Sequence, residues 1–202
     1  MMSVPASARA ADWFVATTGN DANAGTIGSP FRTITKAAVN ARGGDTVKVR
    51  GGVYNEIVKI SSKGTPTARI VFQSYPGEKA IIDGAGTAAG TNLVQLTAAE
   101  YVDFSGFEVR NATRIGICGW GARGVRVLGN DVHHSTRGGI YFGYDSWGFV
   151  SDITISGNSI HDNVLENEFH TMNGGWAQAI GLQYTDGVHV LGNRVFRNHG
   201  EG

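Results

Sequence analysis

Side chains that can move protons or bind anions recur in the second half of this 202-residue chain. Histidine titrates near neutral pH and arginine stays cationic, so these residue types suit proton transfer and anion binding. They gather with polar neighbours in short segments before predicted strands, and these segments contribute Asn111, Arg114, His133, His134, Arg137, Asp162, Glu166, Glu168, His170, Trp176, Arg197, His199 and Glu201. If equivalent segments stack side by side, residues far apart in the sequence meet in one groove.

The elements that would position these side chains share one repeated pattern. Each copy places apolar residues two apart, breaks at a glycine and resumes, and the copies are residues 102–112, 125–135, 153–163 and 188–198. The shared glycines lie 23, 28 and 35 residues apart, at Gly106, Gly129, Gly157 and Gly192. A repeat of this length predicts a solenoid, and alternation of period two predicts short strands with one buried face. Glycine tolerates a left-handed backbone, so a sharp bend is expected at each break.

A third strand is expected before three of the copies, at residues 115–119, 139–143 and 179–183. Three short strands per coil predict an all-β fold, a single-stranded parallel β-helix. A β-sandwich would need hairpin turns, and the even repeat argues against it. Asparagines at equivalent places in successive coils are expected to hydrogen-bond along the axis. In the third strands we expect alternate sides, with Ile140, Phe142, Ile180 and Leu182 inside and Tyr141, Gly143, Gly181 and Gln183 facing solvent.

The first part of the chain predicts a helix before the coils begin. Ser29 is expected to be its N-cap, with Pro30 at the first helical position and Gly43 as a stop signal. This helix is expected to cap the open end of the coil, because an uncovered β-helix exposes unpaired strand edges.

Residues 12–202 are expected to form one β-helix domain, and residues 1–11 a signal-peptide remnant or a disordered tail. That remnant predicts a secreted or periplasmic protein. The chain stops where another strand would begin, so we expect it to lack C-terminal coils and to self-associate through an open last coil.

Composition limits the other classes of function. The chain has 17 Lys and Arg against 17 Asp and Glu, so nothing indicates a basic surface for nucleic acid. No apolar run reaches the length of a membrane span. Cys118 is the single cysteine, so an intrachain disulfide is impossible.

Two N-terminal segments and the glycine-asparagine coils together resemble a known family. Residues 14–38 read FVATTGNDANAGTIGSPFRTITKAA, and residues 43–56 read GGDTVKVRGGVYNE. With the coils, they resemble right-handed parallel β-helix proteins of the pectate-lyase-like group, especially the family 9 polysaccharide lyases, over nearly all of residues 12–202. The resemblance implies a right-handed coil and a secreted carbon–oxygen lyase that cleaves an acidic, uronic-acid-containing polysaccharide by β-elimination. It also implies clustered aspartates that bind Ca²⁺ and a lysine base.

This chain departs from that pattern, because its last lysine is Lys79 and its aspartates are scattered. Another residue must then replace the lysine, and the candidates are His134, Arg137, His170, Arg197 and His199. Candidate Ca²⁺ ligands are Asp162, Glu166 and Glu201. Candidate substrate-binding residues are Asn111, Tyr141, Trp176, Gln178 and Gln183.

Two alternatives stay open at this point. One is a glycoside hydrolase on the same fold, which would need a pair of carboxylates. The other is a non-catalytic β-helix that binds glycans or forms part of a surface structure.

Overall fold

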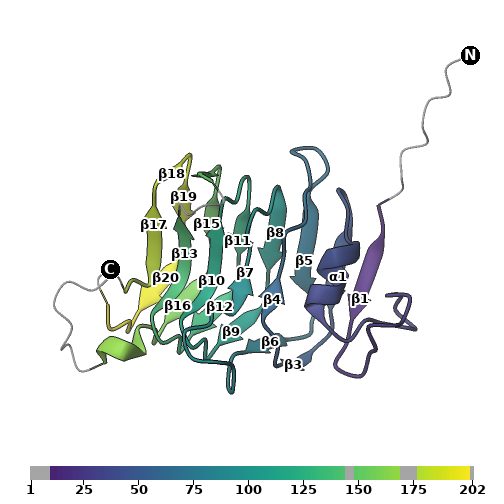
Figure 1. Ribbon diagram of the computed structural model, residues 1–202, viewed down its shortest axis with the longest axis horizontal. Helices are drawn as coiled ribbons and strands as arrows, with labels where there is room; N and C mark the ends of the chain where they lie inside the picture. Colours follow the sequence, from purple (N-terminus) through teal and green to yellow (C-terminus); the bar gives the residue numbers. More distant parts are fainter. Residues whose placement is uncertain (1–9, 144–147, 169–176, 201–202) are drawn as a thin grey trace, which may run out of the picture.

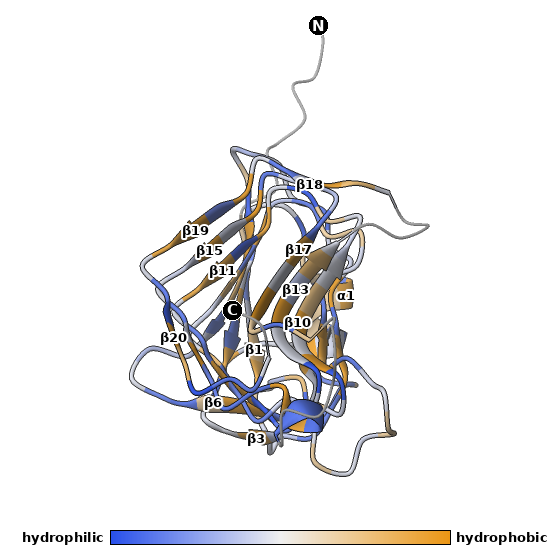
Figure 2. Ribbon diagram, turned by 90° about the vertical axis from the view of Figure 1, so that its left-hand side faces the viewer, coloured by the Kyte–Doolittle hydropathy of each residue, from blue (hydrophilic) through white to orange (hydrophobic). Residues whose placement is uncertain are grey.

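The computed structural model describes residues 10–143, 148–168 and 177–200, which wind into stacked coils. Each complete coil gives one strand to each of three parallel sheets, and equivalent strands lie side by side along the axis (Figure 1). Viewed along that axis, the three sheets surround a common core (Figure 2). The predicted parallel β-helix is therefore confirmed.

The strands are grouped by sheet. The seven-stranded sheet holds β1 (Asp12–Val15), β2 (Thr46–Val49), β5 (Ile70–Ser74), β8 (Val102–Ser105), β11 (Arg126–Leu128), β15 (Thr154–Ser156) and β19 (His189–Leu191). The six-stranded sheet holds β3 (Gly52–Tyr54), β6 (Ala80–Asp83), β9 (Glu108–Arg110), β12 (Asp131–His133), β16 (Ser159–His161) and β20 (Arg194–Phe196). The five-stranded sheet holds β4 (Val58–Lys59), β7 (Val94–Gln95), β10 (Ile115–Trp120), β13 (Gly138–Gly143) and β17 (Ile180–Gln183). A two-stranded sheet holds β14 (Val150–Ser151) and β18 (Thr185–Asp186).

The core is built from rows of apolar side chains that lie in register from coil to coil. In one row, Phe104 pairs with Val127 and Val127 with Ile155, and all three are fully buried. Each such side chain contributes about 1.5–3 kcal/mol by leaving water. On the last described coil, the row members Val190, Val195 and Leu182 are 45%, 45% and 39% exposed, because a described coil stacks on one side of them only.

The alternation expected in the five-stranded sheet holds for the side chains of β13, whereas Leu182 of β17, expected inside, is exposed, and two glycines expected to face solvent are buried. Ile140 and Phe142 are fully buried, and Tyr141 is half-buried. Gly143 and Gly181 are buried although they were expected to face solvent. The reason is the ring of Tyr141, because a Cβ added at either glycine would lie within 2.7 Å of it.

Buried asparagines join the coils at the bend between the seven-stranded and six-stranded sheets. Gly106, Gly129, Gly157 and Gly192 all adopt positive φ, which confirms the predicted bend. The following asparagines form a ladder, in which Asn130 Nδ2 donates to Asn158 Oδ1 (3.1 Å) and Asn158 Nδ2 donates to Asn193 Oδ1 (2.9 Å). A second ladder runs from Asn163 Nδ2 to Asn198 Oδ1 (3.0 Å). The predicted hydrogen bonding along the axis is thus confirmed.

The helix α1 (Ile34–Asn40) starts later than the sequence suggested. Its N-cap is Thr33, whose side chain accepts a hydrogen bond from Lys36 N (3.1 Å). The prediction of Ser29 and Pro30 as the helix start was wrong, because Phe31 N donates to Phe14 O (2.9 Å) and keeps this segment extended beside β1. The helix contacts β1, β2 and β4, and its role as a cap for the open end stays a prediction.

A 3₁₀ turn, η1 (Leu165–Asn167), follows β16. Within the described ranges, no helix combines the length and apolar composition that a membrane crossing requires. Most of the expected signal remnant, residues 1–9, lies outside the described residues.

The asparagine ladder predicts a large loss of stability for Asn158→Ala. Asn158 accepts from the buried amide of Asn130 (2.9 Å) and donates to Val127 O (2.9 Å). Leaving these two buried groups unpaired should lower the free energy of unfolding by roughly 2–4 kcal/mol, measured by urea denaturation. The control Asn55→Ala removes an exposed side chain with one hydrogen bond, to Asp83 O (3.2 Å), and should change that free energy by less than about 0.5 kcal/mol. Equal losses in both variants would contradict a special role for the ladder.

Candidate functional site

A hollow of about 240 Å³ lies on the outer face of the five-stranded sheet. Its lining consists of Arg114, Ile115, Trp120, Arg137, Gly138, Tyr141, Gln178 and Gln183. Arg114 and Arg137 immediately precede β10 and β13, and Arg137 N donates to Arg114 O (2.7 Å). The two arginines therefore occupy equivalent places in neighbouring coils, and Gln178 lies before the next strand, β17.

Tyr141 forms the floor of this hollow beside two other side chains. Its hydroxyl donates to Gln183 Oε1 (2.6 Å), and its ring centroid lies 6.2 Å from that of Trp120. Burial raises the pKa of the Tyr141 phenol, although the nearby Arg114 guanidinium opposes that shift. At neutral pH the phenol is therefore protonated and can donate a proton or a hydrogen bond.

The charge of the hollow is positive. Two guanidinium groups line it, and none of its described lining residues is a carboxylate. Glu166 lies nearby, with its Oε1 at 3.5 Å from Arg137 Nε, whereas Arg114 has no ion pair within the described part of the chain. Guanidinium groups bind carboxylates through parallel hydrogen bonds, so the hollow suits an anionic ligand.

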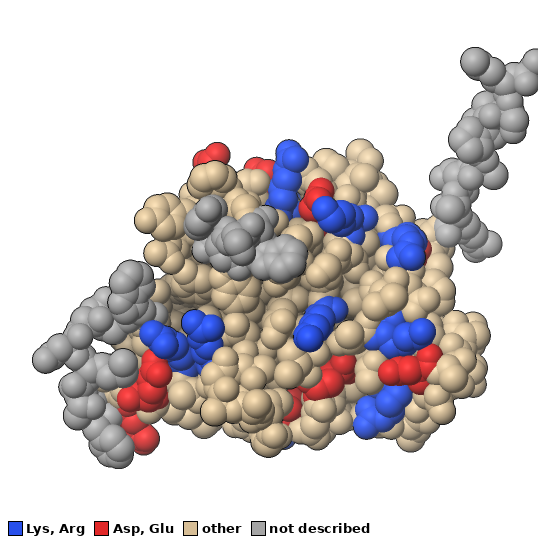
Figure 3. Space-filling view, viewed as in Figure 1, with Lys and Arg blue, Asp and Glu red and all other residues tan. Residues whose placement is uncertain are grey.

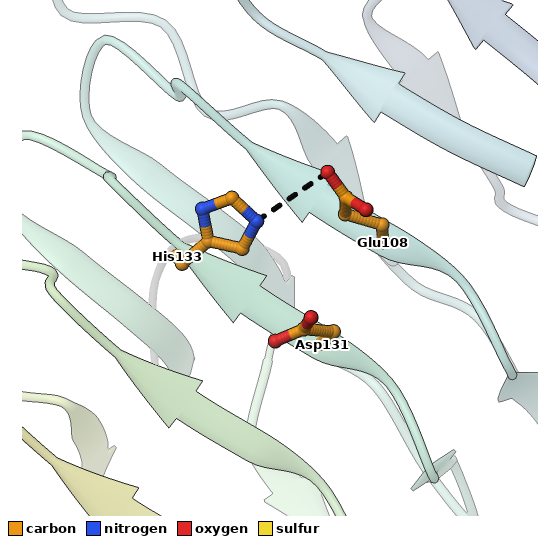
Figure 4. A group of neighbouring side chains, drawn as sticks. All are labelled: Glu108, Asp131 and His133. Carbon is orange, nitrogen blue, oxygen red and sulfur yellow. Dashed lines mark ion pairs between the residues drawn. The ribbon is translucent and has the colours of Figure 1, made fainter.

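A second group of polar side chains lies on the six-stranded sheet (Figure 4). The ligand atoms of Glu108, Asp131 and His133 lie within 4.8 Å of one another, with His133 Nε2 at 3.4 Å from Glu108 Oε1. Glu108 is also paired with Lys79 and with Arg110 Nη1 (2.9 Å).

This donor set does not fit calcium. Ca²⁺ takes six to eight oxygen ligands, whereas these three residues offer one imidazole nitrogen and two carboxylates, and two cations already pair with the Glu108 carboxylate. An imidazole with carboxylates suits a divalent transition metal better. Neither Asp162 nor Glu166, which the sequence suggested as calcium ligands, belongs to this group.

Four of the residues singled out from the sequence occupy one corner of the coil. Asn111, His134, Asp162 and Arg197 all have φ between 51° and 56°, which marks equivalent left-handed positions after successive strands. The Arg197 guanidinium donates two hydrogen bonds to Asp162 (2.7 and 2.6 Å) and, as the main cause, holds the pKa of that carboxyl far below its usual range. This corner does not line the hollow.

The other two corner residues also have polar partners. Asn111 Nδ2 donates to Asp83 Oδ1 (2.9 Å), and His134 Nδ1 lies 2.6 Å from His133 Nδ1. The catalytic and substrate-binding roles assigned to the corner residues stay predictions.

The structure brings four of the candidates named from the sequence together in the hollow: Arg137, Tyr141, Gln178 and Gln183. His199 lies in the last described coil, where its backbone N donates to Asn163 O (3.0 Å). His170, Trp176 and Glu201 lie outside the described residues.

Sequence reasoning placed Arg114 in the predicted groove without a specific role, and it missed one lining residue, Trp120. A signal for Trp120 was present: Cys118 pairs with Tyr141, and Trp120, two residues further along β10, must share the outer face with Tyr141.

A family model described as the Pel9A-like, right-handed β-helix region matches residues 13–202. The chain is 35% identical over 116 residues to a pectate lyase, PEL9, of Emericella nidulans, which covers 50% of this chain and 28% of that protein. It is 32% identical over 114 residues to an uncharacterized protein, YwoF, of Bacillus subtilis, which covers 52% of this chain and 24% of that protein. The matched segment thus spans only about a quarter of the length of each of these relatives.

Solved structures share the fold at low sequence identity. A rhamnogalacturonan lyase has a TM-score of 0.62 at 14% identity, covering 93% of this chain and 57% of its own. A GH136 lacto-N-biosidase from Eubacterium ramulus has a TM-score of 0.68 at 14% identity, and the match covers 94% of this chain and 42% of that structure's chain. Pectate lyase Pel9A has a TM-score of 0.56 at 14% identity, and the match covers 93% of this chain and 62% of that structure's chain. Both lyases and a glycosidase therefore share this architecture.

The packing of Tyr141 over glycine predicts that Gly181→Ala reshapes the hollow. A Cβ at Gly181 would lie 2.6 Å from Tyr141 Cδ2 and 2.7 Å from Gln178 Oε1. Both side chains must move, and a crystal structure of the variant should show the Tyr141 hydroxyl displaced from Gln183. The control Gly28→Ala meets no atom within 4 Å and should leave Tyr141 in place. An unmoved Tyr141 in Gly181→Ala would contradict the packing described here.

Proposed function

The chain belongs to the Pel9A-like family of right-handed β-helices, and from this premise we propose that it is a polysaccharide lyase-like protein that acts on a uronic-acid-containing polymer. The observation that carries the proposal is the hollow on the five-stranded sheet, where Arg114 and Arg137 lie beside Trp120 and Tyr141. Guanidinium groups suit the carboxylate of a uronic acid, and aromatic faces suit the apolar face of a sugar ring.

β-Elimination asks three things of such a site. A base removes the C5 proton next to the substrate carboxylate, its electron pair forms the C4–C5 double bond, and the C4–O bond to the leaving sugar breaks. The leaving oxygen then accepts a proton. Positive charge near the carboxylate stabilises the carbanion-like intermediate, which makes the C5 proton easier to remove.

The residues of the hollow divide among these tasks. Arg114 and Arg137 hold and neutralise the carboxylate. Tyr141 protonates the leaving oxygen, because its phenol carries a proton at neutral pH, and burial raises the pKa of that phenol further. The described lining of the hollow contains no histidine or lysine, so we assign the base to His199, which lies outside that lining and whose neighbour Gly200 lies against Ala177, the residue before Gln178.

Calcium is not needed for these roles. The resemblance to family 9 lyases implies Ca²⁺, but the described acidic group lies on another sheet, where Glu108 is paired with Lys79 and Arg110 and Asp131 Oδ1 lies 2.9 Å from His161 Nε2. In this chain the two arginines supply the positive charge instead.

The alternatives differ in their support. A glycoside hydrolase needs two carboxylates at the reacting bond, and the described lining of the hollow contains none. Binding without cleavage is the second candidate, favoured by one observation: no histidine lines the hollow within the described residues.

A polymeric substrate does not cross membranes, so the protein would act outside the cytoplasm. This is consistent with the secreted or periplasmic location expected from residues 1–11.

The first prediction concerns activity and calcium. Incubated with polygalacturonate or alginate, the protein should form unsaturated products, seen as ultraviolet absorbance, at similar rates with Ca²⁺ and with chelator. Activity that disappears with chelator would show that a metal, not the arginines, carries the charge. A flat trace combined with measurable binding of the polymer would favour the binding protein, and new reducing ends without unsaturation would indicate a hydrolase.

The second prediction concerns the arginines. Arg137→Gln and Arg114→Gln should each lower kcat/KM by about 10- to 100-fold, because each removes a charged hydrogen bond to the substrate carboxylate. Arg126→Gln, on the seven-stranded sheet, is the matched control and should keep full activity. If the control loses as much activity as the hollow variants, general charge and not this hollow explains the effect.

A further inference from the structure

The hollow around Arg137 is one end of a longer depression across the five-stranded sheet. A second hollow of about 530 Å³ shares Arg114 and Trp120 with it and continues toward the N-terminus. A third, of about 520 Å³, shares Lys59, Ser61 and Lys63 with the second and reaches α1. Three hollows that share their walls form one groove, which we call the long groove.

Strand register makes the long groove straight. Lys59 pairs with Gln95, Gln95 with Cys118, Cys118 with Tyr141 and Tyr141 with Gly181, so one row of residues crosses all five strands. Four intervals between parallel strands, each about 4.8 Å, give this row a length of about 19 Å. A 1,4-linked sugar chain advances by a similar step per residue, so such a row is long enough for several sugars.

Cations follow the long groove from end to end. Arg137 and Arg114 lie in the first hollow, Lys59 and Lys63 in the next two, and Arg42 lines the third. None of the described residues that line the three hollows is an aspartate or glutamate. Lys and Arg side chains are visible along this face of the molecule (Figure 3).

The cations along the groove differ in whether an acidic side chain already pairs with them. Lys63 Nζ pairs with Glu100 Oε1 (2.6 Å) outside the lining. Lys59 is exposed on β4 and, like Arg114, has no ion pair within the described part of the chain. A cation without a partner, aimed at a groove without acids, is available to an anionic ligand.

We propose that the coils of β4 and β7 carry an additional binding segment for the same anionic polymer, with Lys59 as its principal contact. This inference rests on the proposed function, because it uses the same ligand class in the first hollow. The polymer lies along the coil axis, with one carboxylate held by Arg114 and Arg137 and another, about two sugars away, held by Lys59, because two strand spacings of about 4.8 Å separate β4 from β10. Long chains should therefore bind more tightly than short ones, and internal stretches of polymer should bind without a free end.

Calorimetry with galacturonate oligomers of defined length tests the inference. A dimer can fill the first hollow, but its carboxylates lie too close together to contact both Arg114 and Lys59, whereas an oligomer of six or more sugars can reach both. The wild-type protein should bind the long oligomer more tightly. Lys59→Gln should weaken binding of the long oligomer by about fivefold and leave dimer binding unchanged, because one solvent-exposed charge contact is lost. Guluronate and mannuronate oligomers form parallel arms that distinguish the source of the carboxylates.

Lys48→Gln is the matched control, because Lys48 lies on β2 of the seven-stranded sheet, away from the groove. Circular dichroism checks that both variants fold. Equal affinity of the wild type for dimer and long oligomer, or an unchanged long-oligomer affinity in Lys59→Gln, would overturn the inference and leave the proposed function standing. A control that weakens binding as much as Lys59→Gln would also overturn it. Failure of the wild type to bind any oligomer would overturn the proposed function itself.

Discussion

Parallel pairing of each strand with the equivalent strand of the next coil is the constraint on which the rest of this structure depends. It places residues 23, 28 or 35 positions apart at one strand spacing, so every row of side chains repeats a single position of the coil. Buried asparagines tie the coils at the bend, because each amide both accepts from one coil and donates to the next. Insertions between coils leave this register intact, since they are confined to connecting segments.

The same register separates charges on the surface of a protein whose formal net charge is zero. On the six-stranded sheet, acids and bases alternate and neutralise one another: Asp83 with Arg110, Glu108 with Lys79, and Asp162 with Arg197. On the five-stranded sheet, the groove carries cations and the described lining has no acid. Net charge therefore said nothing about the face that suits an anionic polymer, because a sum over the whole chain does not show where cations lie without acids.

Small residues and aromatic residues act together in the hollow. The Tyr141 ring lies over two glycines of its own sheet, which lowers the floor of the hollow and holds the hydroxyl at Gln183. This burial also keeps the phenol protonated, so the shape of the hollow and the chemistry of its hydroxyl have one cause. A side chain larger than glycine at position 181 would change both.

The sequence by itself determined the coil, its three strands, the glycine bends and the asparagine ladders, because these are local patterns repeated at a fixed period. It also placed Arg137, Tyr141, Gln178 and Gln183 among the candidates. It misplaced the helix start, because Phe31 pairs with β1 by a contact that no local pattern records. Only the tertiary structure decided that Trp120 joins the hollow, that Asp162 is paired with Arg197, and that Lys59 lies in line with Tyr141. These facts depend on which residues of different coils become neighbours, and that is set by the exact register of the coils, which the unequal insertions conceal in the sequence.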